Sequence, residues 1–129
     1  MMSFDIHNIR ALILDMDGVL WRGKQLIGDL PSIFGDMERK GLKVILASNN
    51  STRTPATYIE KVRSLGVHIE DWQLINSAEA TSDYLSRTYP QGGPVYVVGE
   101  GGLVASLEAK GFAISAEEAI AVVAGLDRQ

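Results

Sequence analysis

Two carboxylates one residue apart follow an apolar run near the start of the sequence. The run A-L-I-L ends at Leu14 and continues as Asp15, Met16, Asp17 and Gly18. Residues two apart in an extended chain project to the same side, so the two carboxylates are expected to converge. Two bare carboxylates about 5 Å apart repel by roughly 3 kcal/mol at an effective dielectric constant of about 20. A hard cation such as Mg²⁺ relieves that repulsion, because it binds one or two carboxylates together with waters and a phosphate.

This carboxylate pair also suits phosphoryl transfer. One aspartate can act as the nucleophile and form an acyl phosphate when a metal screens its charge. The other can protonate the leaving oxygen and later activate a water. The alternative is a strand end that carries two solvated acids, and a D-x-D pair on its own favours that alternative.

A second apolar run ends in small polar residues. Lys43–Ala47 leads directly into S-N-N-S-T, residues 48–52. A serine hydroxyl and several backbone N–H groups at such a strand end could hold phosphate oxygens. Serine and asparagine also favour turns and caps for local reasons, so the segment on its own is equally typical of an ordinary loop.

Strands and helices alternate along the chain, which predicts an α/β fold with mostly parallel pairing. Such sheets bind ligands at the carboxyl ends of their strands, where both polar segments fall. Asn76, with Glu79 three residues later, predicts a helix N-terminus. The predicted strands are Ala11–Leu14, Lys43–Ala47, Gln73–Ile75, Val95–Val98, Phe112–Ile114 and Ile120–Ala124. The predicted helices are Pro31–Lys40, one from Pro55 to Leu65, one from Asn76 to about Arg87, and Leu103–Lys110.

In this order the motifs resemble the haloacid dehalogenase (HAD) superfamily of phosphohydrolases. D-M-D-G-V-L-W-R-G, G-L-K-V-I-L-A-S-N-N-S-T-R-T-P, N-S-A-E-A-T and V-Y-V-V-G-E-G-G-L resemble its NagD-like, p-nitrophenylphosphatase-like branch, which has a large α/β cap of class IIA. The resemblance implies part of a Rossmann-like parallel sheet core plus the first part of an α/β cap. Residues 1–76 would form the first half of the catalytic core, and residues 77–129 would begin the cap.

The resemblance also implies a role for each polar residue. Asp15 would be the nucleophile and a Mg²⁺ ligand. Asp17 would be the general acid/base and would bind Mg²⁺ through its backbone carbonyl. Ser48 would bind the phosphate with help from Asn49. Val19–Gly23 would form a turn and flap beside the site.

Two side chains of this flap have two interpretations. Trp21 and Arg22 would approach the substrate if the flap closes over the site. The alternative is an exposed hairpin.

The predicted function is a Mg²⁺-dependent phosphatase that acts on small phosphorylated metabolites through an aspartyl-phosphate. The family also needs a lysine in a third motif and an acidic loop in a fourth, and neither occurs in these residues: Lys110 and Asp127 stand in the wrong context. We therefore expect the chain to be an N-terminal half that is weak or inactive alone. The alternative is a non-catalytic fragment or decayed relative that binds phosphate or Mg²⁺, or that associates with itself through its open sheet.

The composition indicates which partners and which cellular compartment to expect. The net charge is −4 and no basic run occurs, which argues against a nucleic-acid partner. No apolar stretch approaches the ~20 residues that a membrane span needs, and the N-terminus lacks the apolar centre of a signal peptide. The absence of cysteine fits a reducing compartment, so we expect a cytoplasmic protein.

Two further features have no assigned chemistry. Gly99–Leu103 is similar to a nucleotide-binding loop, but Val104 stands where that loop needs a small residue, which argues against dinucleotide binding. The resemblance to the HAD family implies instead that this segment belongs to the cap. Trp72 is predicted to pack in the interior.

Overall fold

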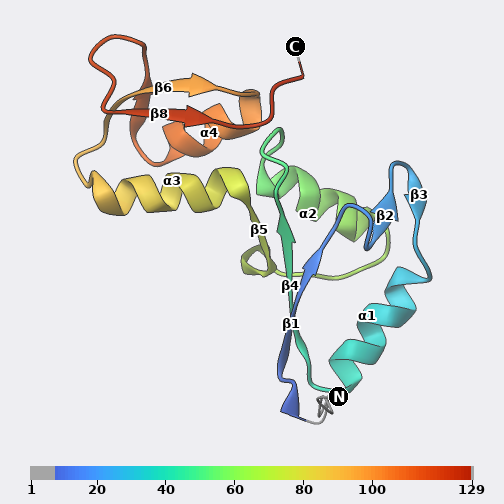
Figure 1. Ribbon diagram of the computed structural model, residues 1–129. Helices are drawn as coiled ribbons and strands as arrows, with labels where there is room; N and C mark the ends of the chain where they lie inside the picture. Colours follow the sequence, from blue (N-terminus) through green and yellow to red (C-terminus); the bar gives the residue numbers. More distant parts are fainter. Residues whose placement is uncertain (1–7, 129) are drawn as a thin grey trace, which may run out of the picture. The chain divides into compact units, whose positions relative to one another are not determined.

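The computed structural model describes residues 8–128 as an α/β chain (Figure 1). Contacts between residues divide it into two compact units. The first holds the residues up to Ala47 together with Ile59–Leu74, and the second holds Ser48–Tyr58 together with the residues from Ile75 on. The two units are therefore interleaved along the sequence. The expected boundary between core and cap at residues 76 and 77 stays a prediction.

Strands and helices alternate as the sequence predicts. The strands are β1 (Ala11–Asp15), β2 (Trp21–Arg22), β3 (Gln25–Leu26), β4 (Lys43–Ser48), β5 (Leu74–Asn76), β6 (Gly93–Val98), β7 (Phe112–Ile114) and β8 (Ala121–Ala124). The helices are α1 (Leu30–Arg39), α2 (Pro55–Ser64), α3 (Ser77–Thr88) and α4 (Gly101–Ala109), with a 3₁₀ turn at Asp71–Gln73.

The central strands pair in parallel. The sheet order is β1-β4-β5, and β1 runs parallel to β4 with Asp15 opposite Ala47. Side chains alternate along β4, where Val44 and Leu46 are buried. Parallel pairing of these two strands brings their carboxyl ends to one edge, which is where the sequence places its polar segments.

Local sequence signals explain where α1 and α2 begin and end. The Oδ1 atom of Asp29 accepts the backbone N–H of Ser32 at 3.3 Å and caps α1. Gly41 and Gly66, at φ of 68° and 81°, lie just after α1 and α2, as a helix stop requires. Pro55 takes the first position of α2, where its missing N–H costs nothing.

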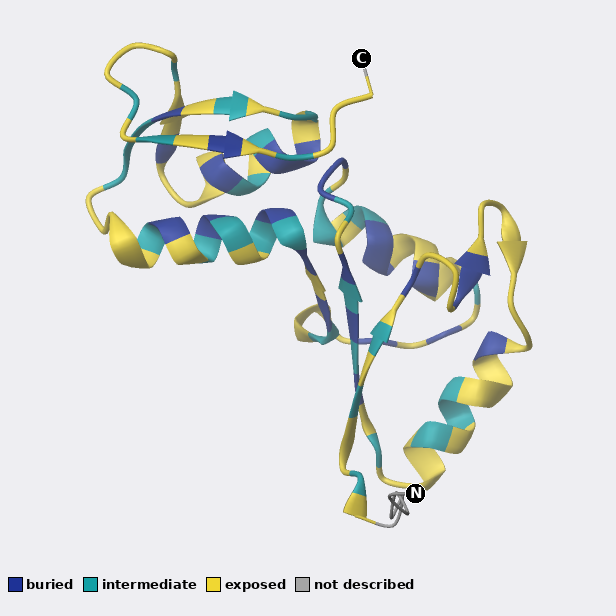
Figure 2. Cartoon of the chain, in the orientation of Figure 1, coloured by how far each residue is buried: buried dark blue, intermediate teal, exposed yellow. Residues whose placement is uncertain are grey.

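The second unit has its own core, formed where α4 packs against α3 and β7. Its sheet has the order β7-β6-β8, and both pairings are parallel. Figure 2 shows buried residues along α3 and α4 and on the strands of this unit. The buried set is Ala78, Leu85, Val95, Leu103, Leu107, Phe112 and Val123. Alternation along β6 and β8 leaves Tyr96 and Val122 exposed on their strands.

The predicted α/β fold with parallel pairing is confirmed, with two local corrections. Helix α4 begins at Gly101 and not at Leu103, so Gly101 and Gly102 lie inside the helix. Trp72 is 63% exposed, so the prediction that it packs in the interior is wrong. Across residues 8–128, no helix is both long enough and apolar enough to cross a membrane.

Candidate active site

Strand β1 delivers the two aspartates on either side of a buried residue. Asp15 and Asp17 are exposed, while Met16 between them is completely buried. The backbone N–H of Met16 donates to Oδ1 of Asp15 at 2.8 Å. The strand ends at Asp15 and the chain bends at Met16, and both carboxylates are accessible.

A tight turn follows the pair. The carbonyl oxygen of Met16 accepts the N–H groups of Val19, Leu20 and Trp21 at 3.3, 2.9 and 3.3 Å. Gly18 has a φ of 86°, and its N–H donates to the carbonyl of Trp21 at 2.7 Å. A side chain at position 18 would be strained in this left-handed conformation, so glycine allows the turn.

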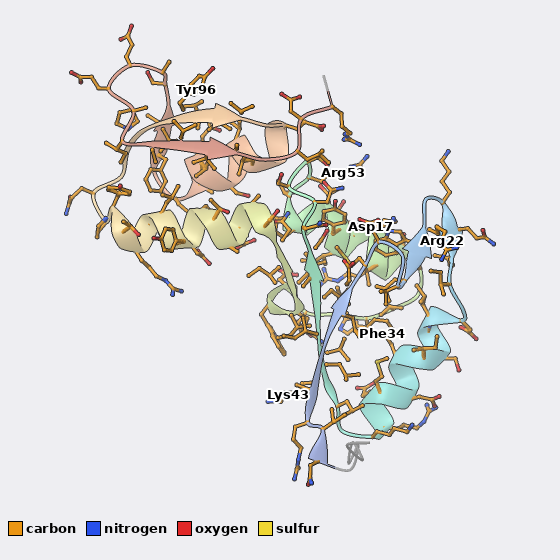
Figure 3. The ribbon with its side chains drawn as sticks, viewed as in Figure 1. Asp17, Arg22, Phe34, Lys43, Arg53 and Tyr96 are labelled. Atoms are coloured by element: carbon orange, nitrogen blue, oxygen red, sulfur yellow. The ribbon has the colours of Figure 1, made fainter. Side chains whose placement is uncertain are left out.

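The turn brings Trp21 back to Asp17. The indole Nε1–H of Trp21 donates to Oδ1 of Asp17 at 2.8 Å, and the Trp21 side chain is only 2% exposed. The Nζ atom of Lys61, from α2, lies 3.5 Å from the centroid of the indole ring. Figure 3 labels Asp17 near the end of β1 and Arg22 on the β2–β3 hairpin.

The hairpin interpretation of the flap is therefore half right. Strands β2 and β3 do pair as an antiparallel hairpin, and Arg22 is exposed on it. Trp21 is buried instead, and its N–H meets a candidate catalytic carboxylate. Sequence reasoning placed Trp21 beside the site but missed Lys61, because a contact between residues 40 positions apart leaves no local signal.

Ser48 and Asn49 lie at the end of β4, directly after Ala47, which pairs with Asp15. Ser48 is buried, and its Oγ accepts the N–H of Asn50 at 3.1 Å. Asn49 is exposed, and its carbonyl oxygen accepts the hydroxyl of Ser77 at 2.9 Å.

The rest of this loop is held by its own side chains. The Oδ1 atom of Asn50 accepts both the N–H and the hydroxyl of Thr52, at 3.0 and 2.7 Å. The side chain thus turns the loop sharply without secondary structure. Ser51 and Thr52 are buried, so the loop after β4 is ordered by packing as well as by hydrogen bonds.

Two glycines of the second unit let its backbone approach the loop closely. A Cβ atom on Gly102 would lie 2.5 Å from the backbone nitrogen of Arg53, and one on Gly125 would lie 2.6 Å from Oγ of Ser51. The N–H of Gly102 donates to the carbonyl of Thr52 at 3.2 Å. The G-E-G-G-L segment therefore has a packing role against the loop, which the sequence did not reveal.

An ion pair secures the segment that follows Gly125. Nε of Arg128 lies 2.7 Å from Oε1 of Glu100, and Nη2 lies 2.9 Å from Oε2. The hydrogen-bonded Arg128 guanidinium lowers the pKa of Glu100 below its ordinary value of 4.5. Glu100 precedes α4, so the pair joins both glycine-bearing segments.

The aspartate pair offers the donor chemistry that Mg²⁺ prefers. Within residues 8–128 no group of three or more His, Cys, Asp or Glu side chains is placed to hold a metal. Mg²⁺ binds through one or two carboxylates and leaves its other positions to water and phosphate, so the pair satisfies its requirement. Among the described backbone hydrogen bonds of the turn, none ends on the carbonyl oxygen of Asp17.

Comparison with known proteins shows the family of the chain. Residues 12–113 match the haloacid dehalogenase-like hydrolases. The chain is 38% identical to glycerol-3-phosphate phosphatase of Gallus gallus over 108 residues. This aligned region is 83% of the chain and 35% of that protein. The chain is 34% identical to acid sugar phosphatase of Staphylococcus aureus over 121 residues. This aligned region is 93% of the chain and 46% of that protein.

Solved structures that superpose on the chain come from the same family of proteins as these sequence relatives. A p-nitrophenyl phosphatase from Archaeoglobus fulgidus superposes with a TM-score of 0.83 at 30% identity, over 92% of this chain and 45% of that one. NagD from E. coli K-12 superposes with a TM-score of 0.80 at 32% identity, over 93% of this chain and 47% of that one. The chain spans less than half the length of each of these proteins. It belongs to the haloacid dehalogenase-like hydrolase family and resembles the amino-terminal half of its NagD and p-nitrophenylphosphatase members.

Proposed function

We propose that the chain supplies the nucleophile, the acid/base and the phosphate-binding loop of a Mg²⁺-dependent phosphatase. The observation that carries the proposal is the pair Asp15 and Asp17, exposed at the end of β1 around the buried Met16. Relatives named as phosphatases support the reaction class. The substrate class we propose is small phosphorylated metabolites, and the compartment is the cytoplasm, in keeping with a sequence without cysteine.

The proposed reaction has two steps that share one acid/base. A carboxylate oxygen of Asp15 attacks the phosphorus, the bond to the leaving oxygen breaks, and Asp17 donates a proton to that oxygen. Asp17, now ionised, then takes a proton from a water that attacks the phosphorus and releases Asp15 and inorganic phosphate. Each group thus returns to its starting state.

Phosphate and metal would be held by the ends of the two neighbouring strands. Ser48 and Asn49 would bind phosphate oxygens through hydroxyl, amide and backbone N–H groups. Asp15, through its carboxylate, and Asp17, through its carbonyl oxygen, would hold Mg²⁺. When bound, the cation screens the negative charge of the phosphate from the nucleophile.

We also propose that residues 1–129 alone are weak or inactive. The lysine and acidic loop of the family's third and fourth motifs do not occur in this sequence. Losing one preorganised electrostatic group commonly lowers kcat by ~10²–10³. Residues 77–129 would form the first part of the cap.

The test compares p-nitrophenyl phosphate hydrolysis by the complete gene product that carries this chain with hydrolysis by residues 1–129. We expect Mg²⁺-dependent turnover in the first and little in the second. Asp15→Asn should abolish turnover, whereas Asp36→Asn removes an exposed carboxylate on α1 and should leave turnover unchanged. Borohydride trapping followed by mass spectrometry should locate the acyl phosphate on Asp15. Full activity in Asp15→Asn would refute the assignment.

A second candidate is a non-catalytic chain that associates with itself. Strand β1 stands at the edge of the β1-β4-β5 sheet, and its Ile13 is 74% exposed. An exposed apolar side chain on an edge strand favours association. Sedimentation equilibrium of residues 1–129 should then show a dimer that Ile13→Thr dissociates. A monomer at all concentrations would exclude this candidate.

A further inference from the structure

The Trp21 side chain combines burial with a hydrogen bond to an exposed carboxylate. An indole has one polar group, a donor, which normally finds a partner when the ring is buried. Here the ring is 2% exposed, and its donor is satisfied by Oδ1 of Asp17 at 2.8 Å. The donor is therefore fixed by packing, while its acceptor reaches the surface.

Lys61 adds a positive charge to the same assembly. Its Nζ lies 3.5 Å from the centroid of the Trp21 ring, within the range of a cation–π contact. A cation on the ring face draws electron density toward itself, which makes the indole N–H a stronger donor. The charge of Lys61 thus supports the hydrogen bond to Asp17 through the ring.

The geometry points to Trp21 and Lys61 as positioning residues for Asp17, an inference that rests on the proposed phosphatase function. The indole fixes Oδ1 of Asp17 in one orientation and leaves Oδ2 to exchange a proton with the leaving oxygen. Holding an acid in the reactive geometry contributes directly to rate, because a small misplacement of a catalytic group is costly. Neither side chain needs to touch the substrate.

A spectroscopic experiment tests the hydrogen bond without catalysis. The complete gene product is labelled with ¹⁵N at its indoles, and the resonance that disappears in Trp21→Phe is that of Trp21. We expect Asp17→Ala to move this resonance upfield and to speed its exchange with water, and Lys61→Met to move it less. The Trp72 resonance should stay in place and serves as the internal reference. A Trp21 resonance that Asp17→Ala leaves unchanged would overturn the inference.

A kinetic experiment tests the positioning role. An alkyl phosphate has a poor leaving group that needs protonation, whereas p-nitrophenyl phosphate has a good one that needs it little. We expect Trp21→Phe to lower kcat on the alkyl phosphate by about 10- to 100-fold with little change in KM, and to lower kcat on p-nitrophenyl phosphate much less. Lys61→Met should show the same selectivity to a smaller degree.

Matched controls separate positioning from packing. Trp72→Phe removes the other, exposed tryptophan of the chain, and Lys24→Met removes an exposed lysine of the β2–β3 hairpin. Both should leave the two kcat values unchanged. Equal losses on both phosphates in Trp21→Phe and Lys61→Met would indicate packing alone and refute the role. If the unmodified protein hydrolyses neither phosphate, the proposed function fails, and the indole resonance still decides whether the hydrogen bond exists.

Discussion

Asn76 and Arg53 are joined by a hydrogen bond that spans 23 positions of sequence. The Nδ2 atom of Asn76 donates to the carbonyl oxygen of Arg53 at 2.8 Å, and its Oδ1 accepts the N–H of Glu79 at 2.9 Å. The side chain is 2% exposed. One buried amide therefore caps α3 and also ties α3 to the loop after β4.

Asn76→Ala should lower the free energy of unfolding by about 2 to 3 kcal/mol, because it removes the cap and leaves the Arg53 carbonyl without its donor. Asn76→Ser keeps a capping oxygen but cannot reach Arg53, so it should cost about half as much. Urea denaturation measures both. Equal losses in the two variants would show that the cap contributes nothing, and an Asn76→Ser variant as stable as the unmodified chain would show that the bond to Arg53 contributes nothing.

Gly102→Ala should destabilise the second unit by about 1 to 3 kcal/mol, since its Cβ would overlap backbone atoms of Thr52 and Arg53. The displaced loop should also lower kcat/KM if Ser48 and Asn49 bind phosphate. The control is its neighbour in α4: a Cβ on Gly101 would meet nothing within 4 Å. Gly101→Ala should therefore stabilise the chain by roughly 0.5 kcal/mol. Thermal melts of Gly102→Ala and Gly101→Ala measure these opposite changes in stability. A Gly102→Ala variant that melts at the same temperature as the unmodified chain would contradict the prediction.

The close contact between Gly125 and Ser51 should appear as energetic coupling. Gly125→Ala places a Cβ 2.6 Å from Oγ of Ser51, and Ser51→Ala removes that oxygen together with its 3.3 Å bond from the N–H of Leu126. The double variant should be more stable than the sum of the single losses predicts, by about 1 kcal/mol. A double-mutant cycle in urea measures this difference. Strict additivity would mean that the two sites relax independently.

Acid should weaken the pair between Glu100 and Arg128. The guanidinium lowers the pKa of Glu100 below 4.5, so the pair stabilises the fold fully above that pH and progressively less as pH falls through the lowered pKa. Glu100→Gln should remove this dependence, so that the melting temperatures of the variant and the unmodified chain converge in acid. Melts from about pH 7 to about pH 3 check it, with Glu117→Gln, a change at an exposed glutamate, as control. A difference in melting temperature between Glu100→Gln and the unmodified chain that grows as the pH falls would contradict this prediction.

The elements could be predicted from the sequence because their signals are local. The cap at Asn76, the first-turn Pro55 and the glycines after α1 and α2 act within a few residues, and each element they bound is observed. The exposure of Asp15 agrees with the alternation along β1, whereas Asp17 lies beyond the bend at Met16, in the turn that follows the strand.

What the sequence did not predict depends on contacts between distant segments. The sequence left two interpretations of Trp21, a side chain that approaches the substrate or one exposed on a hairpin, but its ring is buried and is contacted by Lys61 of α2. Trp72 looked like a core residue but is largely exposed. The roles of Gly102 and Gly125 depend on how near the loop comes, and glycine spacing alone cannot reveal that distance.

The turn after β1 also limits how this segment can change in evolution. A single carbonyl, that of Met16, collects three N–H groups, and Trp21 closes the turn onto Asp17. Exposed positions such as Val19 can accept many side chains. Inserting or deleting one residue between Asp15 and Trp21 would break the convergence of these bonds and carry the indole away from its carboxylate. The segment can therefore vary in composition, but its length is constrained.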